Sequence, residues 1–225
     1  MARILTRILA NAALAALIFG GLATAPAAAA GGSAGNVYTE TNAASGNAIL
    51  AYARSASGAL SWSGTYPTGG LGGGAGLGSQ GAVTVSAGGG WLYAVNAGSN
   101  DVSAFAIEGD ALTLTDRVSS GGTQPISVTA NRGLVYVLNA GTRTISGFSS
   151  ANGALTPIAG STRSLLGSGP AQIQFSPAGN VIVVSEKATS TLETFVVGPG
   201  GLASPPTSHP SLRGIDAFRV RVRTP

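Results

Sequence analysis

One pattern of residues recurs four times along the chain, at intervals of 55, 43 and 47 residues. A branched apolar residue stands next to Tyr or Val, a polar residue follows, and a turn-forming stretch then leads to a second apolar run. The recurring pairs are Val37-Tyr38, Leu92-Tyr93, Val135-Tyr136 and Ile182-Val183. Self-similarity at such a period predicts a series of similar structural units, each too small to bury its apolar face alone.

Each unit contains four short apolar runs, separated by Gly, Asn, Ser and Thr. In the second unit the runs are 82–86, 92–95, 102–105 and a run that opens at 110–112. Runs rich in β-branched and aromatic residues and bounded by turn residues predict strands, and four of them in about 40–50 residues predict a propeller blade. No stretch after residue 30 keeps a helical apolar spacing over three turns. We therefore predict an all-β fold, a β-propeller of four-stranded antiparallel blades.

The number of units predicts only part of a ring. About 195 residues remain after the first 30, and they contain three complete units plus fragments, whereas a closed propeller has roughly four to eight blades. The long first interval is explained by a Gly-rich insert from Gly69 to Gly81. An open arc leaves strand edges unpaired, so the chain is expected to be truncated or to associate with another copy through these edges.

The N-terminal residues have the composition of an export signal. Arg3 and Arg7 precede an apolar run that reaches about Thr24 and is followed by small residues up to Ala30. A basic start, a short apolar segment and small residues before the cleavage point predict a signal peptide over residues 1–30. An uncleaved membrane anchor is the alternative. We expect residues 31–210, the propeller repeats, to be secreted or periplasmic, with no membrane association after cleavage.

Residues 211–225 differ in composition from the repeats. They contain four of the chain's 12 Lys and Arg residues, three of them alternating with apolar residues at 219–223. One hypothesis is a basic edge strand with the arginines on one face. The other is that this stretch is frameshifted sequence, because a neighbouring reading frame can encode residues that resemble the repeat.

Charge and composition exclude several classes of function. Residues 31–210 contain six cations and seven anions, so the net charge of +4 belongs to the two ends and predicts no nucleic-acid partner. The chain has no Cys and a single His, His209, which excludes thiol catalysis, disulfides and Cys- or His-pair metal sites. No metal and no cofactor are predicted.

Residues 78–105 carry a family resemblance. The run Gly88-Gly89-Gly90-Trp91-Leu92-Tyr93-Ala94-Val95-Asn96, followed by Ser99-Asn100-Asp101-Val102-Ser103-Ala104-Phe105, is similar to the repeating unit of the lactonase family, the 6-phosphogluconolactonase-like propellers. The resemblance covers about residues 36–205. It implies a seven-bladed ring, of which this chain supplies about half, and hydrolysis of a sugar lactone.

The same resemblance implies a site at the mouth of the central channel, built from Arg, His and Glu. The segment that carries Arg and His in the family reads Gly169-Pro170-Ala171-Gln172 here, and the segment that carries the carboxylate reads Ser185-Glu186. Glu186 is therefore the candidate catalytic residue. Without the cation and the imidazole, the site is expected to be degraded, which leaves a non-catalytic extracytoplasmic ligand- or protein-binding propeller, or a truncated product without function, as alternatives.

Asn96 and Asn139 occupy the repeat position that Glu186 occupies in the fourth unit. They are candidate ligands for a sugar lactone or another polar molecule, and the alternative is that they cap the following turn. The recurring aromatic residues are expected to form the core between blades. His209, in a Pro-rich stretch, is expected to be solvated in a loop.

Overall fold

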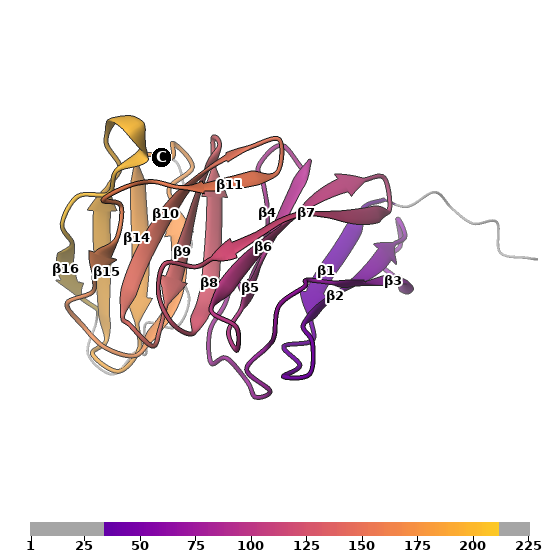
Figure 1. The fold of residues 1–225 in the computed structure, drawn as a ribbon, viewed down its shortest axis with the longest axis horizontal. Helices are drawn as coiled ribbons and strands as arrows, with labels where there is room; N and C mark the ends of the chain where they lie inside the picture. The colour runs from indigo at the N-terminus through magenta and orange to yellow at the C-terminus, as the bar shows by residue number, and fades with distance from the viewer. Residues whose placement is uncertain (1–33, 212–225) are drawn as a thin grey trace, which may run out of the picture. The chain divides into compact units, whose positions relative to one another are not determined.

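A computed structural model describes residues 34–211 as a series of antiparallel β-sheets (Figure 1). The first sheet contains β1 (Asn36–Glu40), β2 (Ala48–Arg54) and β3 (Leu60–Pro67). The second contains β4 (Val83–Val85), β5 (Trp91–Asn96), β6 (Asp101–Glu108) and β7 (Ala111–Ser119). In both sheets each strand pairs with the strand that follows it in the chain.

The third and fourth sheets repeat this up-and-down order. The third contains β8 (Pro125–Asn131), β9 (Leu134–Asn139), β10 (Thr144–Ala151) and β11 (Ala154–Pro157), and the short β12 (Arg163–Ser164) also pairs with β10. The fourth contains β13 (Pro170–Phe175), β14 (Val181–Glu186), β15 (Thr191–Val196) and β16 (Thr207–Pro210), with a 3₁₀ turn, η1 (Pro199–Gly201), before the last strand. The sheets are blades, and together they form about half of a seven-bladed propeller.

The turn between the second and third strands of a blade has the same backbone feature in three blades. Its last residue has a positive φ at Asn100 (60°), Arg143 (51°) and Ser190 (51°). Asn tolerates this left-handed conformation well, whereas Arg and Ser adopt it at some cost. The repeat therefore fixes the backbone of this turn independently of the residue that occupies it.

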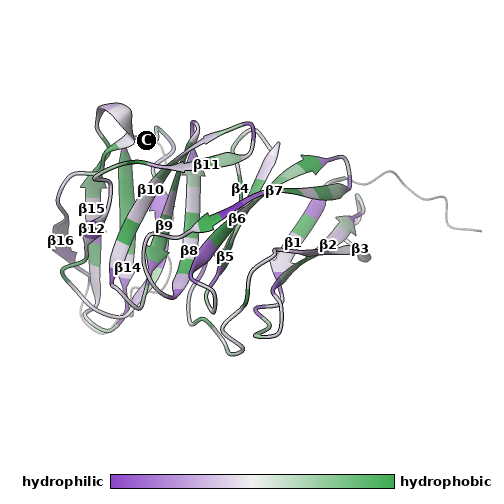
Figure 2. Ribbon diagram, viewed as in Figure 1, coloured by the Kyte–Doolittle hydropathy of each residue, from purple (hydrophilic) through white to green (hydrophobic). Residues whose placement is uncertain are grey.

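The core lies between neighbouring blades. Successive residues of a strand point to opposite faces, so the middle strands of a blade bury apolar side chains on both sides. Figure 2 shows these apolar bands along the middle strands. Three clusters join consecutive blades. They include Ile49, Leu92 and Phe105, then Tyr93, Val137 and Phe148, then Tyr136, Ile173, Phe175 and Phe195. The recurring aromatic residues from Tyr93 onward thus form the predicted inter-blade core.

Within the described part of the chain, residues 34–211, no strand of the first blade takes the inner position that β4, β8 and β13 occupy in the others. Consequently β1 is only half-buried, whereas β5, β9 and β14, its equivalents, are buried along almost their whole length. The insert Gly69–Gly81 forms the connection from β3 to β4 and contains no strand. Association with another copy through the open edge of β1 stays a prediction.

One detail of the prediction was wrong. The Pro-rich stretch around His209 is a strand, not a loop, because β16 pairs with β15 as an outer edge strand, where a Pro without an N–H can face outward. His209 is exposed, as expected, and its Nε2 lies 3.0 Å from Thr194 Oγ1. The predicted signal peptide and, apart from Ser211, the basic tail lie outside the described residues. Within residues 34–211 no helix is long and apolar enough to span a membrane.

Candidate functional site

The residues that the resemblance selects lie side by side at one end of the fourth blade. Pro170 pairs with Glu186, and Gln172 pairs with Ser185, across the inner strand β13 and its neighbour β14. Ala171 and Gln172 are buried. The candidate carboxylate and the two positions that lack Arg and His therefore belong to one cluster.

Glu186 is paired with a second carboxyl group, that of Glu193 on β15. Neither residue has exposed surface. Thr191 Oγ1 donates to Glu186 Oε2 at 3.1 Å. The backbone amides of Leu166 and Gly167 donate to Glu193 Oε1 at 2.7 and 2.9 Å. Burial, followed by the neighbouring Glu193, raises the pKa of Glu186 to about 7. Sequence reasoning missed Glu193, although it stands seven residues after Glu186, as Ser103 and Ser146 stand after Asn96 and Asn139.

A glycine in each connection between blades lies against the polar residue at this position. A side chain at Gly167 would collide with the Glu186 carboxyl group, and one at Gly122 or Gly70 would collide with Asn139 or Asn96. The backbone of the connection therefore covers the polar residue and separates it from solvent. Gly122 and Gly167 each stand three residues before the inner strand of their blade, whereas the insert separates Gly70 from β4.

Asn96 and Asn139 are bound within the protein. Asn96 has no exposed surface, and its amide contacts four side chains: Thr68 Oγ1 (2.7 Å), Asn47 Nδ2 (3.0 Å), Asp101 Oδ1 (2.5 Å) and Ser103 Oγ (2.8 Å). Asn139 Nδ2 donates to Ser120 O at 3.2 Å and to Ser146 Oγ at 3.4 Å. In this structure both residues join a blade to the connection that precedes it. Ligand binding by either residue stays a prediction.

The Gly-rich insert crosses the inner strands of the third and fourth blades. Leu77 packs against both of the apolar clusters that involve the third blade. The polar contacts of the insert are Ser79 Oγ to Ile126 O (2.8 Å), Gln80 N to Ala171 O (3.0 Å) and Lys187 Nζ to Gly78 O (2.6 Å). The insert thus brings Lys187, the cation next to Glu186 in the sequence, into a contact at the inner side of the blades.

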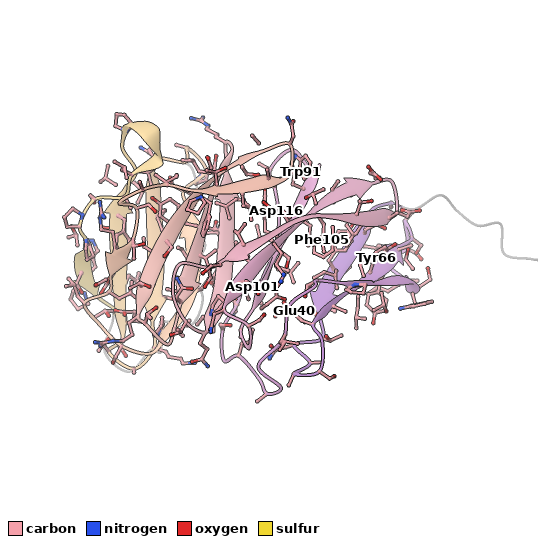
Figure 3. The ribbon with its side chains drawn as sticks, viewed as in Figure 1. Glu40, Tyr66, Trp91, Asp101, Phe105 and Asp116 are labelled. Carbon is pink, nitrogen blue, oxygen red and sulfur yellow. The ribbon has the colours of Figure 1, made fainter. Side chains whose placement is uncertain are left out.

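A hollow of about 700 Å³ lies between the first blade and the insert. Residues 40–45 line one side, and residues 74–77 with Ser79 and Ala82 line the other. Glu40 is the last residue of β1 in the first blade. It lies at the same end of the blades as Asp101 of the second blade (Figure 3). Asn47 Nδ2 donates to Glu40 Oε2 at 3.2 Å, while Glu40 Oε1 is buried without a partner. Burial raises the pKa of Glu40 to about 7. Sequence reasoning counted Glu40 only as a charge.

A family model described as "Lactonase, 7-bladed beta-propeller" matches residues 37–164. This match spans more than half of the chain. The chain belongs to the lactonase family. A comparison with curated protein sequences finds no match.

Solved structures share the fold of this lactonase-family chain. A candidate 6-phosphogluconolactonase from Bacteroides fragilis is 21% identical with a TM-score of 0.59, covering 76% of this chain and 53% of its own. One from Bacteroides uniformis is 17% identical with a TM-score of 0.50, covering 78% of this chain and 68% of its own. A protein of unknown function from Desulfotomaculum acetoxidans is 17% identical with a TM-score of 0.58, covering 76% and 52%. The chain spans between about half and two thirds of the length of these structures.

The described residues of this lactonase-family chain offer no metal centre. Among residues 34–211, no three His, Cys, Asp or Glu side chains come close enough together to hold a metal ion. The ion pair between Arg117 Nη1 and Asp101 Oδ2, at 2.7 Å, lies on the second blade. The groups near β13 and β14 are carboxyl, amide and hydroxyl groups, the ammonium group of Lys187 and the guanidinium group of Arg143, which donates to Gly167 O.

Proposed function

We propose that this chain is an exported lactonase-family protein that hydrolyses a sugar lactone slowly, with Glu186 as the group that activates water. The observation that carries the proposal is the position of Glu186, which pairs with Pro170 of the inner strand in the segment that resembles the family's site. A carboxylate at the inner end of a blade is suited to accept a proton from water.

The reaction needs one proton transfer in each direction. Glu186, when ionised, accepts a proton from water as the water oxygen adds to the lactone carbonyl. The tetrahedral intermediate then breaks its bond to the ring oxygen, which takes the proton and becomes the hydroxyl group of the open acid. Because Glu186 has no exposed surface and Gly167 lies against its carboxyl group, the connection 165–169 must move before a substrate can approach.

The site supports only weak catalysis. The positions of the family's Arg and His hold Ala171 and Gln172, which supply no cation and no imidazole. Loss of one donor to a developing oxyanion costs about 10²–10³ in rate in a hydrolase. Residues 31–210 contain one more anion than cations, so we propose an uncharged sugar lactone, not a phosphorylated one, as substrate.

Hydrolysis of δ-gluconolactone, measured by pH-stat with the chain purified after export, tests the proposal. We expect turnover above the uncatalysed rate, and we expect Glu186→Gln to abolish it. Glu108→Gln is the matched control, since Glu108 is exposed at the end of β6. Turnover that is equal in the native protein, Glu186→Gln and a buffer blank would refute the proposal.

The hollow at Glu40 favours a second candidate function, binding of a polar ligand without catalysis. Its lining combines one buried carboxyl group with hydroxyl groups and small residues, which suits a neutral polyol or sugar. Equilibrium dialysis with radiolabelled gluconate and gluconolactone tests this function. Binding that Glu40→Gln weakens and Glu186→Gln leaves unchanged would favour it over hydrolysis at Glu186.

A further inference from the structure

The repeat places a pair of polar side chains at the same site in three blades. In the second blade the pair is Asn96 and Ser103, with Nδ2 2.8 Å from Oγ, and in the third it is Asn139 and Ser146, at 3.4 Å. The register of β14 with β15 puts two carboxyl groups, Glu186 and Glu193, at this site in the fourth blade. An amide and a hydroxyl are neutral, whereas two carboxylates would place two negative charges in a buried site.

The hydrogen bonds leave one oxygen of each carboxyl group without a donor. Glu193 Oε1 accepts the amides of Leu166 and Gly167, and Glu186 Oε2 accepts the Thr191 hydroxyl. Glu186 Oε1 and Glu193 Oε2 are buried and have no partner among the protein groups. Leaving buried polar atoms unsatisfied is costly, and a single proton held between these two oxygens would satisfy both.

Within residues 34–211, no Lys, Arg or His side chain forms an ion pair with Glu186 or Glu193. From the connection that precedes β13, only backbone amides reach Glu193. Neighbouring elements carry three cations and one imidazole, each with another partner: Arg143 donates to Gly167 O, Arg163 to Gly160 O and Thr162 O, Lys187 to Gly78 O, and His209 contacts Thr194. β13 contributes no ionisable side chain. A proton is therefore the simplest positive charge that the site can take.

We propose that Glu186 and Glu193 share one proton and act together as a pH-sensitive latch on the connection between the third and fourth blades. Two backbone amides of the connection, those of Leu166 and Gly167, donate to Glu193 Oε1. Glu186 holds the proton and donates to Glu193 Oε2. When Glu186 ionises, the two carboxylates repel each other, and the connection 165–169 that covers them is expected to open and admit water. This latch goes beyond the proposed hydrolysis and does not depend on it.

The direction of the pH dependence follows from the raised pKa of Glu186, about 7 in place of 4.5. The folded protein binds this proton more tightly than the unfolded chain does. The stabilisation by this group is therefore complete below pH 4.5, is lost as pH rises toward 7, and changes no further above it. A shift of this size corresponds to a loss of up to roughly 300-fold in the ratio of folded to unfolded protein.

Hydrogen exchange of the connection, measured by mass spectrometry between pH 5 and 8 and corrected for intrinsic exchange, tests the latch. In the native protein we expect protection of the peptide that contains 165–169 to fall as pH rises from 5 to about 7 and then to stay constant up to pH 8. Glu186→Gln keeps a donor to Glu193 and removes the titration, so its protection is expected to stay constant with pH. Glu40→Gln is the control, because it removes the other carboxyl group with a pKa of about 7 and leaves the pair intact.

A second measurement does not depend on the folding of Glu186→Gln. In the native protein, infrared difference spectra between pH 6 and 8 are expected to show the loss of a protonated carboxyl band. Part of this loss is expected to remain in Glu40→Gln, because Glu186 still titrates there. Constant protection of 165–169 in the native protein, or the same loss of protection in Glu186→Gln, would overturn the proposal. Neither result depends on lactone hydrolysis, so the latch and the proposed function can fail separately.

Discussion

Replacing Tyr136 by Phe removes a hydroxyl group that holds two blades together. Tyr136 has no exposed surface, and its ring meets Phe175 edge to face at 5.9 Å. Its hydroxyl donates to Gly201 O at 2.5 Å and accepts from the Ala203 amide at 3.1 Å. Since Tyr136 belongs to the third blade and residues 201 and 203 to the fourth, these bonds cross the interface between blades.

The expected cost follows from the two groups that lose their partner. A buried donor or acceptor left unsatisfied costs about 1–3 kcal/mol, so with two such groups Tyr136→Phe is expected to lower the free energy of unfolding by about 2–6 kcal/mol. For a body of this size, each kcal/mol lowers Tm by about 2–4 °C. We therefore expect Tm to fall by roughly 4–24 °C, with little change in the packing of the ring.

Tyr93→Phe is the matched control. Tyr93 occupies the equivalent position in the second blade, and its hydroxyl makes one bond, to Ser150 Oγ at 2.8 Å, beside a surface hollow. Water can replace this partner, so the loss is expected to be about 1 kcal/mol. Urea unfolding followed by tryptophan fluorescence measures both variants. Equal losses in the two variants would refute the argument that the Tyr136 hydroxyl stabilises the interface through buried bonds.

Three further substitutions follow from the contacts at the blade connections. Gly167→Ala should destabilise the protein by about 1–3 kcal/mol, because the added methyl group overpacks against Glu186; urea unfolding measures this loss. Gly90 has open space around it, so Gly90→Ala should be neutral or stabilising. Asn96→Ala should cost about 3 kcal/mol because several buried partners lose a bond; an equal or smaller loss than that of Asn139→Ala would contradict this. Burial raises the pKa of Glu40 to about 7, so Glu40→Gln should remove part of the loss of stability that the native protein undergoes between pH 4.5 and 7. An unchanged slope of the free energy of unfolding against pH would contradict the burial of the Glu40 carboxyl group.

The repeat made most of the fold predictable. Short apolar runs between turn residues identified the strands around Leu92-Tyr93 and Val135-Tyr136, and the matching positions of the aromatic residues identified the inter-blade core. The edge strand β16 was missed because its pairing depends on a neighbour, β15, and not on its own Pro-rich composition. The missing inner strand of the first blade was likewise not assigned, since the sequence defines runs and not which of them lies innermost.

The candidate site was predictable only in part. The sequence alone determined the residue types: a carboxylate at Glu186, Ala and Gln where the family has Arg and His, and a near-neutral body without Cys. Only the tertiary structure brought Glu193, with the amides of Leu166 and Gly167 that donate to it, next to Glu186. Burial, followed by the neighbouring Glu193, then raised the pKa of Glu186 toward neutrality. The physical reason is that an ionisation equilibrium depends on the solvent and charges around a group, and these are set by chain segments that lie next to one another only after folding.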